Sequence, residues 1–366
     1  MSTAAQAPKP ADAETGVGTT AADRFGPSRL GGLASWEALL AVVLLGMVGF
    51  GAATSPEFFL TPGNFSNLAA AVMEVAIMAL PLTLIIILGE IDLSVESMLG
   101  LSSAVLGLLW AAGVPLEVGI PVVLVMGAAG GLLNGLLVAR GGLPSLVVTL
   151  GTMALFRGLA LVVLGPLGIS RFPEAFTEFG FGNVPGTPIP WPLVVFTVIA
   201  VGLGLVLHRT WIGRQIFAAG KNKDAARYSG VRVQRLKIAL FVLSGTIAAL
   251  AGVILTARFA SARADAGMGM TLPAVTMVLL GGVSIFGGRG TIPGVVLAVF
   301  TLAVLGNVLR LAAVAAELQS IAIGLLLIVS VAIPSLARQV SSRIDRARRD
   351  RLPPVGAAEP GEMSGP

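Results

Sequence analysis

Residue types that carry much of enzyme chemistry are absent or rare in this chain of 366 residues. It has no cysteine and one histidine, His208. The absence of cysteine excludes disulfide bonds, thiolate nucleophiles and cysteine metal sites. One histidine excludes the two-histidine zinc motif, and a Ser-His-Asp site would have to use His208 at the end of an apolar run. We therefore expect no catalytic residue, no metal and no cofactor, and an enzyme embedded in the membrane is the least favoured class.

Charged residues are also scarce. They make up 12% of the chain, against 55% hydrophobic residues, and the mean hydropathy is +0.91. Several apolar runs reach about 18 residues, which is enough to cross a hydrocarbon core of roughly 30 Å. Glycines four apart, Gly127, Gly131 and Gly135, predict close packing between such helices. The sequence predicts an all-α polytopic membrane protein that contacts lipid. Because its basic residues flank the spans, we expect no nucleic-acid partner.

Composition divides the chain into three regions. Residues 1–35 are polar and are expected to form a disordered cytoplasmic tail. Residues 36–337 form the membrane domain, with a long cytoplasmic loop at 209–237. Residues 338–366 form a second cytoplasmic tail, basic at first and then rich in Pro and Gly.

Ten apolar spans are predicted within the membrane domain. They cover about 36–55, 68–88, 97–112, 116–139, 143–165, 190–208, 236–257, 272–287, 291–311 and 318–336. The stretch 166–189 contains four prolines, so it is predicted to be a loop that carries a short helix.

The distribution of basic residues predicts the orientation. Ten spans place both termini on one side of the membrane, and nineteen of the 24 Lys and Arg residues lie on that side. The loop 209–237 holds eight of them and one acid, Asp224. By the positive-inside rule this side is the cytoplasm.

Within this loop, residues 221–231 predict a short helix. Asn222 is a suitable N-cap and Gly230 a suitable end. Ala225, Ala226 and Tyr228 are expected to face outward, where they could enter a groove on a soluble partner. The alternative is that the basic residues of the loop only set the orientation.

The chain has no phosphate-binding loop of the Walker type. Its only Gly-Lys pair is Gly220-Lys221, with Gln215 where that motif requires glycine and Asn222 where it requires Ser or Thr.

Glycines crowd a late segment between two spans. They break or bend helices, which membrane proteins tolerate where the backbone is buried or lines a cavity. A tight loop between two spans is the alternative. The residues are Gly281, Gly282, Gly287, Gly288, Gly290 and Gly294.

Three acids interrupt an apolar run at Glu90, Asp92 and Glu96. A carboxylate inside a bilayer costs several kcal/mol, so such residues face a cavity or lie at an interface. Asp92 precedes Leu93-Ser94 and predicts a turn or helix start, where its carboxylate accepts backbone N–H groups. Direct contact with a substrate is the alternative for Asp92. The sequence does not explain Glu90 or Glu96.

Five polar residues inside spans are candidates for a translocation path, because they can hydrogen bond to a solute. For each of them, hydrogen bonding between helices is an equal alternative. The five are Glu74, Asn134, Thr149, Thr152 and Asn307.

Four segments together resemble a known family. Ile91-Asp92-Leu93-Ser94-Val95 resembles the G-G-I-D-L-S-V-G hallmark of the ribose-type permease subunits of bacterial sugar ABC importers. Residues 130–161, 213–237 and 276–298 resemble the next segment, the ATPase-coupling loop and the late glycine-rich segment of those permeases. The matching residues of the loop are Gly213, Arg214, Gly220, Asn222, Ala225, Ala226, Tyr228, Ser229 and Gly230.

The resemblance extends over residues 36–336 and implies a non-catalytic permease subunit of the bacterial cytoplasmic membrane. It implies a second permease subunit, identical or similar, two ATPase subunits that hydrolyse ATP, and an extracytoplasmic binding protein. Residues 259–267 and 276–288 look closest to the permeases for rhamnose and for autoinducer-2. This chain departs from the pattern at Glu90 and Glu96, where the family has glycine.

The rival function is an ion-coupled secondary carrier, with Glu74, Glu90, Asp92 and Glu96 as its ion sites. Inverted halves would favour it, but the sequence has no clear internal repeat.

Overall fold

The computed structural model describes residues 28–315, 317–322, 324–326 and 328, and the side chains from residue 36 onward. The tail 338–366, most of the tail 1–35 and part of the span expected at 318–336 therefore lie outside the described residues.

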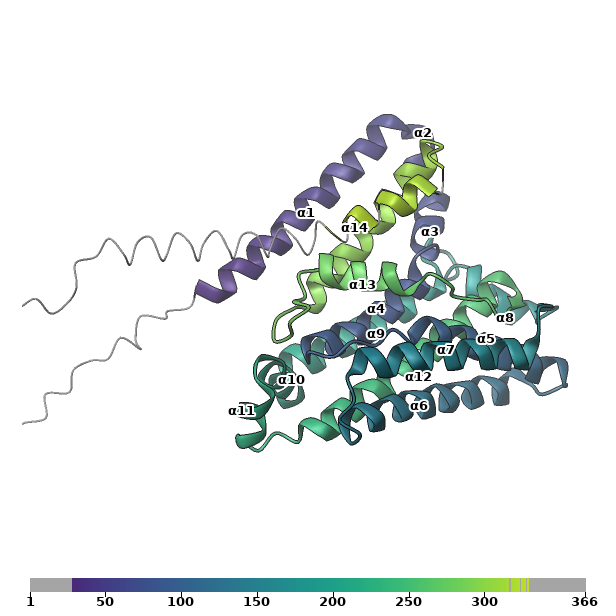
Figure 1. Ribbon diagram of the computed structural model, residues 1–366. Coiled ribbons are helices and arrows are strands. Elements are labelled where there is room, and N and C mark those ends of the chain that lie inside the picture. Colours follow the sequence, from purple (N-terminus) through teal and green to yellow (C-terminus); the bar gives the residue numbers. More distant parts are fainter. Residues whose placement is uncertain (1–27, 316, 323, 327, 329–366) are drawn as a thin grey trace, which may run out of the picture.

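The regular secondary structure of the described residues is almost all helical, apart from one very short pair of strands and an isolated bridge between Asn183 and Pro190 (Figure 1). Strands β1 (Ile169–Ser170) and β2 (Ser261–Ala262) pair antiparallel. The helices are α1 (Ser28–Thr54), α2 (Pro56–Phe59), α3 (Pro62–Ala70), α4 (Met73–Ile87), α5 (Val95–Ala111), α6 (Leu116–Ala139), α7 (Ser145–Leu164), α8 (Glu174–Phe181), α9 (Trp191–Arg209), α10 (Trp211–Lys221), α11 (Lys223–Tyr228), α12 (Val233–Phe259), α13 (Thr271–Leu280) and α14 (Ile292–Leu311).

Six of these helices are long and apolar enough to cross a membrane: α6, α7, α9, α12, α14 and the Trp36–Thr54 part of α1. Helices α3 and α4 make a seventh span if the pair, bent by 49°, counts as one. This confirms the all-α polytopic class. The number of ten spans stays a prediction, because α5 and α13 are shorter than a full crossing.

The span expected over 272–287 is helical only as far as Leu280. Gly282 follows with φ +84°, a left-handed conformation that ends the helix. The helix thus breaks within the expected span, at the glycines that the sequence predicts to break or bend helices. The loop expected at 166–189 does contain a short helix, α8.

Helix α4 lies at the centre, and all of its residues are buried. Helix α12 packs along α6 through glycines. A Cβ added to Gly131 would lie 2.2 Å from the carbonyl oxygen of Phe241, and one added to Gly127 would lie 2.5 Å from that of Gly245. The predicted glycine packing is thus confirmed at both positions.

The two ends of the molecule differ. Helices α10 and α11 lie at one end, here named the α11 end, and α8 lies at the opposite end (Figure 1). The β1–β2 pair connects the chain that follows α7 to the chain that follows α12. The opposite end is therefore named the β1–β2 end.

Candidate functional site

Helix α11 forms as the sequence predicts. The Asn222 side chain accepts hydrogen bonds from the backbone N–H groups of Asp224 and Ala225, both at 3.0 Å. At the other end, Gly230 has φ +85° and reverses the chain toward α12. The cap and the glycine therefore set the helix bounds.

The outward face of α11 differs from the expectation at one residue. Tyr228 is 92% exposed and Ala225 is exposed, but Ala226 is only 4% exposed and belongs to the main core. Successive residues of a helix point about 100° apart, so Ala225 and Ala226 cannot share a face. The prediction that Ala226 faces outward was wrong.

Helix α10 was missed in the sequence, where its residues read only as part of a basic loop. Its buried residues Gly213, Ile216 and Ala219 recur every third position, and Arg214 between them is exposed. This helical spacing was the signal that could have revealed it.

Backbone segments from three sequence motifs meet at the α11 end. The N–H of Gly288 donates to the carbonyl oxygen of Ile87 at 2.7 Å. A Cβ on Gly220 would lie 1.9 Å from that same oxygen, and a Cβ on Gly287 would lie 3.1 Å from the Cα of Gly89. We name Ile87, Gly89, Gly220, Gly287 and Gly288 the glycine junction. It packs α10, the late glycine segment and the end of α4 together without side chains between them.

The other late glycines shape the turn from α13 to α14. A Cβ on Gly294 would lie 2.3 Å from the carbonyl oxygen of Gly281, so these two positions hold the helix ends together. Gly282 packs beside Trp36, and Gly290 has φ +151°. Both proposals for this segment, a helix break and a tight connection, therefore describe it.

Glu90 connects the acidic segment to the α10–α11 region. Its Oε1 lies 2.8 Å from Nζ of Lys223 and 2.6 Å from Nζ of Lys237, and the residue is 5% exposed. Burial raises the pKa of Glu90, but the hydrogen bonds from the two lysines outweigh it and hold the pKa below its usual range. This carboxylate is thus paired with two ammonium groups.

Asp92 holds the turn that precedes α5. Its Oδ1 accepts from the backbone N–H of Ser94 at 3.0 Å and from the Ser94 hydroxyl at 2.6 Å. Its Oδ2 accepts from the Ser244 hydroxyl at 2.8 Å. Asn134 Nδ2 donates to the Ser94 hydroxyl at 2.9 Å. This geometry fits the expected turn and connects it to α6 and α12.

The rest of the Ile91–Val95 motif rests on α7. The N–H of Ile91 donates to the Ser145 hydroxyl at 3.1 Å, and Thr149 donates to the carbonyl oxygen of Ile91 at 3.4 Å. Leu93 is partly buried and Val95 begins α5.

The five candidate path residues do not gather in one place. Asn134 and Thr149 lie at the acidic turn, and Thr149 and Thr152 both donate to carbonyl oxygens of their own helix, those of Ser145 and Val148. Glu74 is completely buried, with its Oε1 2.7 Å from Nε of Arg258. Asn307 exchanges amide hydrogen bonds with Asn64.

Glu96 contacts the start of another helix. Its Oε2 accepts from the backbone N–H of Thr271 at 2.9 Å, at the first residue of α13. A carboxylate is favourable at a helix N-terminus, both as an acceptor and through the helix dipole. Because Glu96 and Thr271 lie 175 residues apart in the sequence, no local pattern could have predicted this contact.

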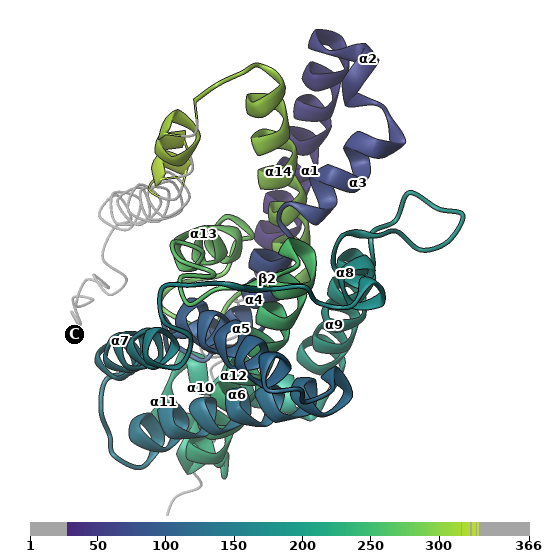
Figure 2. The ribbon, with the colours of Figure 1, turned by 90° about the vertical axis from the view of Figure 1, so that its right-hand side faces the viewer.

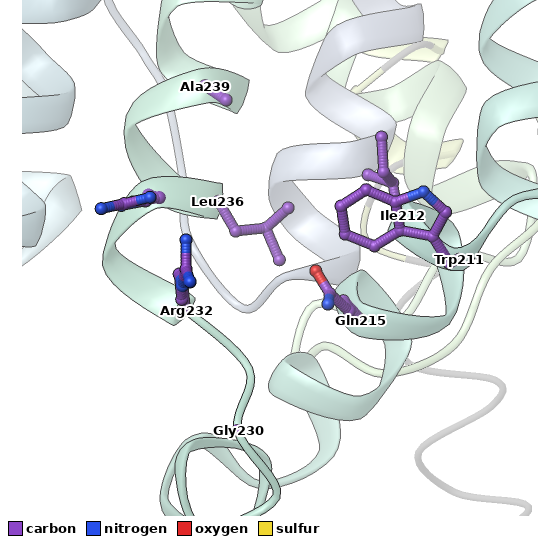
Figure 3. Close-up of a pocket in the computed structure, with 8 residues that line it drawn as sticks. Trp211, Ile212, Gln215, Gly230, Arg232, Leu236 and Ala239 are labelled. Carbon is purple, nitrogen blue, oxygen red and sulfur yellow. The ribbon is translucent and has the colours of Figure 1, made fainter.

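A groove of about 440 Å³ lies between α10 and the start of α12 (Figure 3). Trp211, Ile212 and Leu236 form its apolar wall, and Arg232 lies at its rim beside Gly230. The groove therefore reaches Gly230, which follows α11, and offers an aromatic surface with positive charge.

Comparison with known proteins agrees with this arrangement. Residues 64–331 match the family described as branched-chain amino acid transport system / permease component. The chain is 40% identical over 303 residues to the autoinducer 2 import system permease protein LsrD of Yersinia enterocolitica, covering 81% of this chain and 90% of that protein. It is 38% identical over 328 residues to the LsrD proteins of Escherichia coli O9:H4 and Shigella flexneri, covering 87% of this chain and 98% of each relative. No solved structure matches the chain. The chain therefore belongs to the branched-chain amino acid transport system / permease component family, as a multi-pass permease subunit of the ABC importer class in the bacterial cytoplasmic membrane.

Proposed function

We propose that this permease imports a small polyhydroxylated solute by alternating access, driven by separate ATPase subunits that bind at α11. The observation that carries the proposal is the connection between α11 and the acidic segment. Lys223 at the start of α11 and Lys237 in α12 both bind Glu90, two residues before Asp92. A displacement of α11 would therefore be passed to the turn that precedes α5.

The glycine junction supports the same route. Its backbones lie in direct contact, so α10 and the end of α4 have no flexible side chain between them to absorb a movement. Close-packed elements of this kind shift as units between discrete arrangements. A push on α10–α11 would thus move the Ile91–Val95 segment and the turn between α13 and α14.

Charge supports a cytoplasmic α11 end. This end contains the basic stretch 209–237, and basic residues are retained in the cytoplasm. The second permease subunit would pack beside this one. The extracytoplasmic binding protein would dock at the β1–β2 end, on the opposite side of the membrane.

The solute is proposed from the relatives. LsrD proteins are named for autoinducer-2 import, and the similarity covers nearly all of their length. A monosaccharide such as rhamnose or ribose has the same hydroxyl chemistry. The family description names branched-chain amino acids, which carry a carboxylate and an ammonium group instead, so leucine is the comparison solute in the experiments below.

An ion-coupled carrier is less well supported. Such a carrier needs carboxylates that can release and take up ions. Glu74 and Glu90 are each paired with a basic side chain, and Asp92 and Glu96 accept hydrogen bonds.

Co-purification tests the proposal. The tagged chain is isolated from gently solubilised membranes as wild type and as the double variant Ala225→Asp, Tyr228→Asp. Both residues are exposed, so the fold should tolerate the change, and Ala226 is left intact because it is buried. We expect an ABC ATPase to accompany the wild type and to be lost from the variant. Thr187→Asp, in the exposed loop that follows α8 at the β1–β2 end, is the matched control and should retain the ATPase. If no ATPase accompanies a well-expressed wild type, the proposal fails.

A further inference from the structure

A non-helical segment runs back into the membrane between β2 and α13. It passes the first turns of α5 in the opposite direction. A Cβ on Gly100 would meet the carbonyl oxygens of Ala266 and Ala264, a Cβ on Gly267 would meet that of Glu96, and the N–H of Thr271 is held by Glu96. We name residues 263–272 with the first turn of α5 the α5–α13 junction.

This junction lies within the thickness of the membrane. From Thr271 to the α11 end, α13 has ten residues, and at 1.5 Å per residue it covers about 15 Å. Helix α5 continues from Glu96 for about 22 Å in the opposite direction, toward Ala111. Both helices therefore begin part of the way through a hydrocarbon core of roughly 30 Å. Figure 2 shows α13 on the side of the molecule away from α8 and α9.

The surface of the junction is unsuited to lipid. Arg263 and Asp265 are exposed and form an ion pair at 2.8 Å, and Gly269 presents exposed backbone. Non-helical backbone and charges at membrane depth are tolerated only where they are buried in protein or line a cavity with water. Met268 and Leu272 are also exposed, at 67% and 64%, on the same stretch.

Beneath this surface, the junction holds polar atoms with no hydrogen-bond partner among the described residues. They are the hydroxyl oxygens of Ser97 and Thr271 and the Nη2 of Arg157. Ser97 is 1% exposed and Thr271 is 6% exposed. The other nitrogen of this guanidinium, Nη1, donates to the carbonyl oxygens of Ala264 and Ala266 at 2.8 and 3.1 Å.

Buried unpaired polar groups are costly, and a protein retains them where a ligand can complete them. Here three such groups lie along one junction, in the first turns of two helices and on the side chain that supports the segment between them. The nearby charges of Glu96, Arg157, Arg263 and Asp265 sum to zero, which favours an uncharged solute with hydroxyl groups.

We propose that the α5–α13 junction is a hydroxyl-binding subsite on the translocation path, with Thr271, Ser97 and Arg157 as hydrogen-bond partners of a polyhydroxylated, uncharged solute. The proposal rests on the proposed import function. Gly267 and Gly269, with φ +78° and +79°, form the left-handed turns on either side of Met268.

The first test measures whether water reaches the α5–α13 junction. Because the chain has no cysteine, each introduced cysteine is its only thiol. Leu272→Cys and Met268→Cys are placed singly in the full chain and treated, in right-side-out membrane vesicles, with a membrane-impermeant methanethiosulfonate. The cysteine thiolate, which forms in water, attacks this reagent, forms a mixed disulfide and releases methanesulfinate. Val125→Cys in α6 and Val198→Cys in α9, exposed at 69% and 67% on apolar spans, are the matched controls. We expect both junction cysteines to react at least tenfold faster than the controls. Reaction no faster than the controls overturns the proposal.

Protection by solute is the second test. Autoinducer-2 should slow the labelling of Leu272→Cys, ribose should do so at higher concentration, and leucine should not. Adding Thr271→Val should raise the half-protecting concentration of autoinducer-2 about three- to tenfold, the loss expected for one hydrogen bond. Thr271→Ser keeps the hydroxyl, so the half-protecting concentration of autoinducer-2 should stay within twofold of its value without this change. No protection, or an equal loss in the two Thr271 variants, overturns the proposal.

The two proposals fail separately. Labelling and protection need no ATPase, whereas the co-purification depends on α11 and not on Thr271. Retention of the ATPase by Thr271→Val would also show that the variant folds.

Discussion

Two of the regions where this permease departs from regular helix differ in how their polar groups are paired. At the α11 end, backbones touch at Gly220 and Gly288, and Glu90 has two lysine partners. At the α5–α13 junction, the hydroxyls of Ser97 and Thr271 remain unpaired. Complete pairing suits a connection that transmits movement, and incomplete pairing suits a place where a solute is bound and released.

The same carboxylate chemistry appears in both places with different consequences. Glu90 and Glu96 belong to the same acidic segment. Glu90 is held by lysine ammonium groups, whereas Glu96 holds the N–H of Thr271. Substitutions at matched positions in the two regions should therefore separate packing and charge pairing from solute binding.

The largest effect is expected at the glycine junction. Gly220→Ala would place a Cβ 1.9 Å from the carbonyl oxygen of Ile87, and backbone on both sides leaves no side chain to move away. Overpacking of this kind costs about 1–3 kcal/mol or more. We expect a lower unfolding temperature in detergent and loss of the co-purified ATPase.

Gly151→Ala is the matched control for this change. Gly151 lies in α7, and a Cβ there would meet nothing within 4 Å. The variant should be as stable as wild type or slightly more so, since alanine favours helix. Equal destabilisation by the two changes would contradict close packing at Gly220.

The next effect concerns the pairing of Glu90. Glu90→Gln leaves the ammonium groups of Lys223 and Lys237 without an anion, and we expect a loss of about 1–3 kcal/mol in unfolding free energy. Glu57→Gln, on the exposed helix α2, is the control and should change stability by less than about 0.5 kcal/mol. A Glu90 variant as stable as this control would show that the pair is not needed.

The pKa of Glu90 also predicts how the difference in unfolding free energy between wild type and Glu90→Gln depends on pH. Because its pKa is lowered in the folded protein, the stabilisation is present above the pKa of the unfolded chain and is lost as the pH falls through the folded value. Wild type and Glu90→Gln should therefore converge in stability in acid and differ at neutral pH. Chemical unfolding measured across this range checks the sign, and a gap that widens in acid would contradict it.

Local signals in the sequence were sufficient for much of this molecule. The Asn222 cap and Gly230 located α11, and the four-residue spacing of Gly127 and Gly131 predicted helix packing. These features depend on neighbours in the chain. By contrast, Glu90 with Lys237 and Glu96 with Thr271 join residues far apart in the sequence, and no single-chain pattern encodes such pairs.

The candidate path residues show the same limit. Polarity inside a span identified Glu74 and Asn307 as unusual, and the structure gives Glu74 an ion pair with Arg258 and Asn307 a pair of amide hydrogen bonds with Asn64. Nothing in the sequence distinguishes Ser97 or Thr271, because a single hydroxyl in an apolar helix is common. Their lack of hydrogen-bond partners becomes visible only in three dimensions.

The smallest effect is expected at Glu96, and it sharpens the contrast with Glu90. In Glu96→Gln the amide oxygen can still accept from the N–H of Thr271, so only the charge beside the N-terminus of α13 is lost. That loss is worth about 0.3–1 kcal/mol, below the loss at Glu90. Unfolding of the two Glu→Gln variants under the same conditions gives the order directly. If Glu96→Gln proves the more damaging change, then Glu96 and Arg157 stabilise each other across the junction, and the carboxylate supports the subsite through its charge rather than as a cap.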